Sequence, residues 1–136
     1  MAIQYSTTHR TNAMSQLNTD IGANAVIKVF TGSPPANCGT ADTGTLLVQF
    51  AGNAGGFGTA SGGVLTASAV ASVNAVAAGT AGYFRIYPTA ATTTNAVVQG
   101  TCTATGGGGD MILTNTNIAN GQACNFTSLT VTAFGA

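Results

Sequence analysis

The sequence predicts a mainly β protein, an antiparallel β-sandwich or jelly roll of about seven or eight strands with one short N-terminal α-helix. Three observations carry this prediction. Short segments rich in Val, Ile, Phe, Tyr and Thr recur along the chain. Clusters of Gly, Pro, Asn and Ser separate them at short intervals. Helical periodicity is confined to the first 22 residues, so the helix–strand alternation of a doubly wound fold is missing.

The length of 136 residues suits a single domain, with an N-terminal arm and helix over residues 1–22 and a sandwich after it. Such a chain is long enough to bury about two-thirds of its unfolded surface. Low charge and many glycines also occur in disordered proteins, but disordered chains are poor in β-branched and aromatic residues. The segments 26–30 and 83–87 are rich in both. We therefore expect a folded core.

The N-terminal helix is predicted from a single apolar stripe at the spacing of an α-helix. The stripe consists of Ala13, Met14, Leu17 and Ile21. Thr8 or Thr11 is expected to cap the N-terminus, and Gly22 stands where a glycine commonly ends a helix. Asp20 falls in the last turn, which is the less favourable end for an anion.

The first two strands are expected over residues 25–31 and 45–51. In the first strand, side chains alternate between two faces, with Val26, Lys28 and Phe30 on one of them. The segment 33–37 contains Pro34 and Pro35 and ends this strand, because proline cannot donate to a ladder of hydrogen bonds.

The middle of the chain is predicted to be a loose, glycine-rich loop over residues 52–63, followed by a strand over 64–78 that is broken along its length. The loop contains a single bulky side chain, Phe57. Alanines in the second segment would suit a helix, but its valines and hydroxyls favour a pleated surface.

A strand over 82–88 follows, with Tyr83, Arg85 and Tyr87 on one face and Phe84 and Ile86 on the other. The segments 96–105 and 110–115 flank four consecutive glycines. Because glycine adopts positive φ without penalty, this pattern predicts a β-hairpin. Asn120-Gly121 marks another turn, and residues 122–134 supply the last one or two strands.

Charge is scarce, since three Lys and Arg and three Asp and Glu make up only 4% of the residues, against about 25% in an average domain. Acid–base chemistry and metal binding depend mainly on the side chains that are missing. We therefore expect no catalytic residues, no cofactor and no metal, and a surface that favours association. A net charge of zero gives no basis for binding nucleic acid, and no apolar run approaches the roughly 20 residues that span a bilayer.

Two further patterns could carry chemistry. Cys38, Cys102 and Cys124 are odd in number and widely spaced, which favours buried thiols over disulfides or a zinc site. Asp42-Thr43-Gly44 matches the tripeptide of aspartic proteases. That chemistry needs a second carboxylate, which the retroviral type obtains by dimerisation, and a three-residue match is weak. Glycan hydrolysis likewise needs two suitably placed carboxylates.

Arg85 is expected to stack on the neighbouring tyrosine rings or to bridge to Asp42 or Asp110. Tyrosine and arginine are also enriched at the centres of interfaces. A structural or interface role for this face is therefore favoured over ligand binding.

The order of several segments along the chain resembles a family of small virion structural proteins of tailed bacteriophages. After the N-terminal helix come VFTGSPPANC (29–38), ADTGTLL (41–47) and GTAGYFRIY (79–87), followed by QGT (99–101), GGGGDM (106–111) and GQ (121–122). The resemblance covers nearly the whole chain.

This resemblance implies a capsid decoration or cement protein, made in the host cytoplasm, that sits on the capsid surface of the virion, binds the major capsid protein and self-associates as a homo-oligomer. It implies no enzymatic activity. A structural protein of the tail, collar or fibre attachment is the alternative. The side chains expected at the interface are Met14, Leu17, Pro34, Pro35, Phe57, Tyr83, Arg85 and Tyr87, together with the 52–63 loop.

Overall fold

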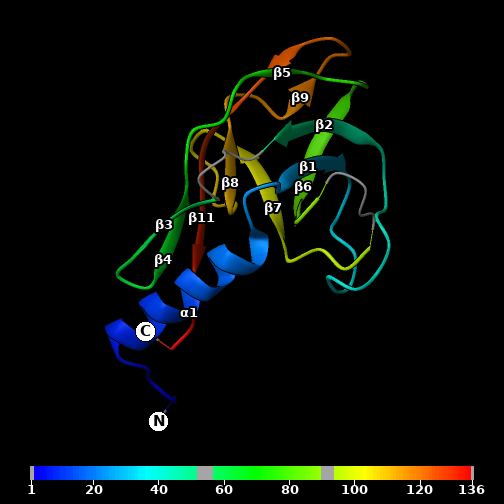
Figure 1. Cartoon of the computed structure of the whole chain (residues 1–136). Coiled ribbons are helices and arrows are strands. Elements are labelled where there is room, and N and C mark those ends of the chain that lie inside the picture. Colours follow the sequence, from blue (N-terminus) through cyan, green and yellow to red (C-terminus); the bar gives the residue numbers. More distant parts are fainter. Residues whose placement is uncertain (1, 52–56, 90–93, 136) are drawn as a thin grey trace.

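The computed structural model of the chain describes residues 2–51, 57–89 and 94–135. It contains one helix and a set of mostly short strands (Figure 1). In chain order these are α1 (Thr7–Ile21), β1 (Val26–Thr31), β2 (Leu46–Ala51), β3 (Gly58–Ser61), β4 (Val64–Ala67), β5 (Val73–Asn74), β6 (Gly79–Tyr87), β7 (Val98–Ala104), β8 (Met111–Leu113), β9 (Asn117–Ile118), β10 (Ala123–Cys124) and β11 (Phe126–Thr132).

Most strands belong to one sheet in the order β2-β1-β6-β7-β8-β11-β4-β3, and β9 pairs with β6 at one end. β10 and β5 form a separate pair. The large sheet curls, so that β1, β2 and β6 lie at one side of the molecule and the β3–β4 hairpin at the other (Figure 1). The pairing is antiparallel throughout the described strands except between β7 and β8. The prediction of a mainly antiparallel, sandwich-like β fold with an N-terminal helix is confirmed.

Helix α1 turns most of its apolar stripe inward, with Ile21 fully buried and Met14 and Leu17 packed against the core, whereas Ala13 is exposed. Gly22 ends the helix as predicted, at a φ of 77°. The predicted N-cap was wrong, because the hydroxyl of Ser6 accepts from the backbone N–H of His9 at 3.2 Å.

The expected hairpin across the four glycines is also wrong, because β7 and β8 run parallel, with Cys102 opposite Met111. The intervening chain doubles back along β7 before it turns again. Asp110 accepts from the backbone N–H of Thr101 at 3.0 Å, and the N–H of Gly109 donates to the hydroxyl of Thr103 at 3.0 Å. A Cβ on Gly109 would meet Thr103 at 2.8 Å, so only glycine lets this segment lie so close.

The prediction of a loop over residues 52–63 is corrected in part. Residues 52–56 lie outside the described residues, whereas Gly58–Ser61 forms β3 and pairs with β4 in a hairpin. Phe57 is buried in the core. The Asn18 side chain ties this hairpin to α1, accepting from the N–H of Phe57 and donating to the carbonyl of Gly58, both at 3.1 Å.

The core lies inside the curl of the sheet, where apolar side chains of several strands meet. Phe50 and Phe126 pack edge to face with ring centroids 5.4 Å apart. The central strands β1 and β6 are buried on both faces: Ile27, Val29, Phe84 and Ile86 point into this core, and the opposite face is covered as well.

Candidate functional site

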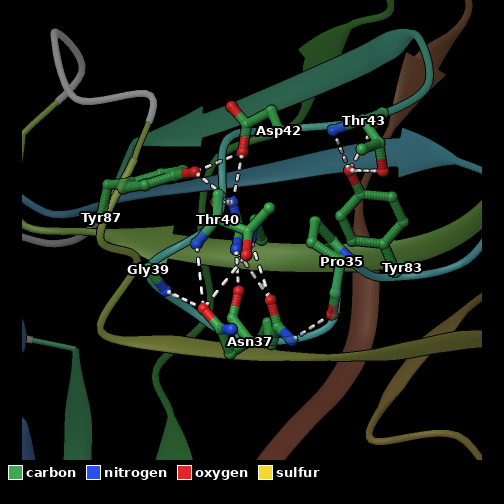
Figure 2. Close-up of polar contacts among 10 residues, drawn as sticks. Pro35, Asn37, Gly39, Thr40, Asp42, Thr43, Tyr83 and Tyr87 are labelled. Atoms are coloured by element: carbon green, nitrogen blue, oxygen red, sulfur yellow. Dashed lines mark hydrogen bonds and ion pairs between the residues drawn. The ribbon is translucent and has the colours of Figure 1, made fainter.

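The second face of β1 and β6, here called the outer face, is the most densely hydrogen-bonded polar region in the described chain. On it, Lys28 lies opposite Arg85 in the antiparallel register, with Val26 opposite Tyr87 and Phe30 opposite Tyr83. The loop over residues 32–45, which connects β1 to β2, lies over this face (Figure 2). All six of these side chains are buried.

Arg85 fixes the loop through backbone carbonyls. Its Nη1 donates to the carbonyl of Thr40 at 2.7 Å, and its Nη2 donates to that of Asn37 at 2.9 Å. On the other side, Nε and Nη2 donate to Oε1 of Gln99 on β7, at 3.1 and 2.9 Å. One guanidinium thus joins two positions of the loop to the sheet beneath it.

The same guanidinium forms an ion pair with Asp42, with Nη1 and Oδ1 2.9 Å apart. The Arg85 side chain is fully buried, and that of Asp42 is 17% exposed. Nη1 also donates to the hydroxyl of Tyr87 at 3.1 Å, and this hydroxyl donates to Asp42. The expected bridge from Arg85 to Asp42 is confirmed.

These contacts set the protonation states. Burial lowers the pKa of Arg85, but the hydrogen bond to Asp42 and the interactions with Tyr87 outweigh it, so the pKa lies above its ordinary value. Burial, followed by the hydrogen bond to Asp42, raises the pKa of Tyr87 to about 12. At neutral pH the guanidinium is therefore charged and the phenol is protonated.

Tyr83 holds the end of the same loop. Its hydroxyl accepts from the backbone N–H of Thr43 at 3.0 Å and donates to the carbonyl of Thr43. Its ring stacks on Phe30, with centroids 5.0 Å apart. Gly44 follows at a φ of 72°, and a Cβ there would lie 2.2 Å from the carbonyl oxygen of Thr31. The loop returns to the sheet through a turn that only glycine fits.

The loop also carries its own turn. Oδ1 of Asn37 accepts from the backbone N–H of Gly39 at 2.9 Å and from that of Thr40 at 3.1 Å (Figure 2). This side-chain turn aims the carbonyls of Asn37 and Thr40 at Arg85. Nε2 of Gln99 donates to the carbonyl of Pro35 at 2.8 Å, which ties down the start of the loop.

The geometry makes this cluster a structural anchor. A guanidinium has five N–H donors, and Arg85 directs its donors at acceptors from the loop and the sheet while remaining fully buried. No donor faces solvent to bind a substrate anion.

Within a single chain, the three carboxylates do not come together as a protease dyad. Asp42 is engaged by Arg85 and Tyr87, while Asp20 on α1 accepts from Gln16 and Asp110 before β8 accepts from Thr101. The three carboxylates lie on separate elements.

The side chains expected at an interface fall into two groups. Phe57, Tyr83, Arg85 and Tyr87 are buried within the monomer, as is Pro35. The expectation that they contact a partner directly is corrected, because the 32–45 loop covers three of them and the core encloses Phe57. Met14, Leu17 and Pro34 are half-buried. Tyr83, Arg85 and Tyr87 are brought together in one cluster, whereas the two α1 residues lie apart from it.

Sequence reasoning missed Asn37, Thr40 and Gln99, which complete the anchor. The Asn37-Cys38-Gly39 spacing is a local signal for a side-chain turn. Gln99 has no such signal, because its contact with Pro35 joins residues 64 positions apart.

The expected burial of the cysteines holds for two of the three. Cys102 and Cys124 are buried, Cys38 is half-buried, and none of the three forms a disulfide. Across the described ranges, no group of three His, Cys, Asp or Glu side chains could hold a metal ion. No helix there has the length and apolar character needed to cross a membrane.

Large apolar side chains that are well exposed are Ile3, Tyr5, Val76 and Phe134. Three of them belong to the two terminal segments, which meet beside the start of α1 (Figure 1). Exposed large apolar side chains are therefore concentrated next to the chain ends.

Comparisons of the chain with protein-family models, with curated proteins and with solved structures find no match.

Proposed function

We propose that the chain is a structural subunit of a bacteriophage virion, a decoration or cement protein that binds the shell of the major capsid protein and stabilises it. The observation that carries this proposal is that the buried guanidinium of the one dense polar cluster described makes its hydrogen bonds within the chain. Arg85, paired with Asp42, holds a loop on the sheet. An ion pair that fixes a loop on the sheet is consistent with a structural role for this protein.

The mechanism of stabilisation would be mass action. A protein that binds only the assembled shell lowers the free energy of that state relative to the dissociated one. The exposed surface offers hydroxyls, amides and apolar groups, and exposed apolar side chains gather at the end where the termini meet. Burial of such surface at junctions between coat subunits, aided by self-association, would supply the binding energy.

The low charge also predicts how attachment to the shell depends on salt concentration. Interactions between exposed charges are screened beyond about 10 Å at 0.1 M salt, but only six residues of this chain are charged. Attachment that depends mainly on apolar burial should change little between low and moderate salt.

The test is the copy number of this chain in purified particles of the phage that encodes it, measured by quantitative mass spectrometry against the major capsid protein. A copy number comparable to that of the coat subunit is expected. A few copies per particle would replace the proposal with the tail, collar or fibre-attachment role. Absence from the particle would refute both.

A further inference from the structure

The two terminal segments and the start of α1 enclose a pocket, here called the terminal pocket. The N–H of Tyr5 donates to the carbonyl of Gly135 at 2.8 Å, which joins the N-terminal arm to the C-terminal segment. The N–H of Ala133 donates to the carbonyl of Gly63 at 2.9 Å, and the N–H of Gly63 donates to the hydroxyl of Thr11 at 3.0 Å. These hydrogen bonds hold the segments around the pocket in place.

Most of the pocket wall is apolar. Its volume is about 180 Å³, and its lining is Tyr5, His9, Arg10, Ala13, Met14, Ala133 and Phe134. Phe134 is 88% exposed and Tyr5 47% exposed. Pockets for small-molecule ligands usually exceed roughly 300 Å³, so this one is suited to a single apolar side chain.

The polar part of the wall is cationic. Arg10 forms no ion pair within the described residues, and its Nε is buried without a hydrogen-bond partner there. The guanidinium lies across Gly63, where an added Cβ would meet its Cζ at 3.3 Å. His9 stands next to it, with its ring 5.1 Å from that of Tyr5.

Nothing acidic in the described chain balances this charge. The first turn of α1 contains no acidic residue, although the positive end of a helix dipole favours anions. Asp42 and Asp110 are engaged elsewhere, and Asp20 lies at the far end of the helix, about 15 Å along its axis.

We infer that the terminal pocket docks a segment of the shell protein in which a large apolar side chain stands next to a carboxylate. The apolar side chain fills the space between Tyr5, Met14 and Phe134, and the carboxylate pairs with Arg10. This inference rests on the proposed function for the identity of the partner, whereas the chemistry of the site rests on the pocket alone.

The first test measures binding of a small probe to the terminal pocket of the isolated chain, without any virus particle. An NMR titration of the ¹⁵N-labelled chain uses 3-phenylpropionate as the probe and its uncharged amide as the matched control. The carboxylate should shift the amide signals around His9, Ala13 and Ala133, and the amide probe should bind about tenfold more weakly. Equal binding of both probes, or shifts spread over the whole chain, would overturn the inference.

Variants then locate the contacts. Arg10→Gln should weaken the carboxylate about tenfold and leave the amide probe unchanged. Phe134→Ser should weaken both probes, and its high exposure keeps the fold intact. Asn12→Ala, on the exposed side of the same helix, is the control and should bind like the original chain.

The second test adds the particle. The original chain and the same variants are mixed with purified shells that lack it, and the bound fraction is measured by sedimentation. If the original chain binds and both pocket variants lose binding, the docking site is supported. If all bind equally, the inference fails while the proposed function stands.

If the original chain does not bind shells, the proposed function fails along with the named partner, and the titration still decides the chemistry of the pocket. The same variants are examined for self-association by analytical ultracentrifugation. A dimer that Arg10→Gln and Phe134→Ser both disrupt would place a second copy in the pocket and overturn the shell protein as its occupant.

Discussion

Replacing Asp42 with Asn removes the charge that balances Arg85 while keeping the size of the side chain and one oxygen acceptor. In the fold, Arg85 is fully buried and Asp42 is the carboxylate paired with it, at 2.9 Å. Lys28, also buried, is its cross-strand neighbour on the outer face. The variant therefore leaves the buried Arg85 guanidinium without the carboxylate that balances its charge.

The expected cost follows from this burial. Removing one partner of a buried ion pair typically costs about 3–5 kcal/mol, because the remaining charge is uncompensated. Asp42 is 17% exposed and asparagine retains a hydrogen-bond acceptor, so we expect the lower end, about 3 kcal/mol. In a domain of this size, that loss lowers Tm by on the order of 10 °C.

The assay is urea denaturation followed by far-ultraviolet circular dichroism, from which the free energy of unfolding is obtained by linear extrapolation. Asp20→Asn is the matched control, since it makes the same chemical change at an exposed position on α1. Its effect should lie within about 0.5 kcal/mol. If Asp42→Asn destabilises no more than Asp20→Asn does, the argument that the ion pair anchors the loop is refuted.

Three further predictions concern Tyr87, the cysteines and two glycines. The Tyr87 hydroxyl, whose pKa is raised to about 12 mainly by burial, should titrate late when phenolate absorbance is followed. Because the folded pKa lies above the unfolded value of about 10, its contribution is complete below pH 10 and is lost between pH 10 and 12, on the order of 2 kcal/mol. Burial raises the pKa of the Cys102 thiol to about 12, so in the native protein a disulfide reagent should label half-buried Cys38 first. Gly82→Ala should destabilise by about 2 kcal/mol or more, since its Cβ would lie 1.9 Å from the carbonyl oxygen of Gly32, whereas Gly108→Ala, in open space, should be tolerated.

Each of these has a contrary outcome. Unfolding free energy that stays constant up to pH 12 would show that Tyr87 is not held as a buried phenol. Mass spectrometry that finds Cys102 labelled as fast as Cys38 would contradict its burial. Equal denaturation midpoints for the two glycine variants would mean that the backbone at Gly82 is not confined.

Much of the secondary structure follows from local patterns. The apolar stripe of α1, its end at Gly22, and the alternation through β1 and β6 depend on residues within a few positions of one another. The break within 64–78 also appears in the fold, as β4 and β5. Such features survive folding because the helical and strand periods are properties of the backbone itself.

The predictions that failed concern segments whose local sequence is compatible with more than one backbone conformation. Four glycines permit a hairpin, but they equally permit the chain to double back along β7 and enter β8 in the parallel direction. Ser6 and Thr8 are both acceptable caps, and the structure places Ser6 before the first turn. No local sequence pattern indicates the terminal pocket, because its walls come from both ends of the sequence.

The sequence by itself determined that this chain folds as a mainly β domain with a helical start, and that Arg85 had few acids to pair with. Only the tertiary structure decided that Asp42 is the partner and that Tyr83, Arg85 and Tyr87 face inward under a loop. The physical reason is distance along the chain: Arg85 meets Asp42 across 43 positions and Gln99 across 14. A period-two pattern tells which side chains share a face, but burial of that face depends on which distant segment covers it.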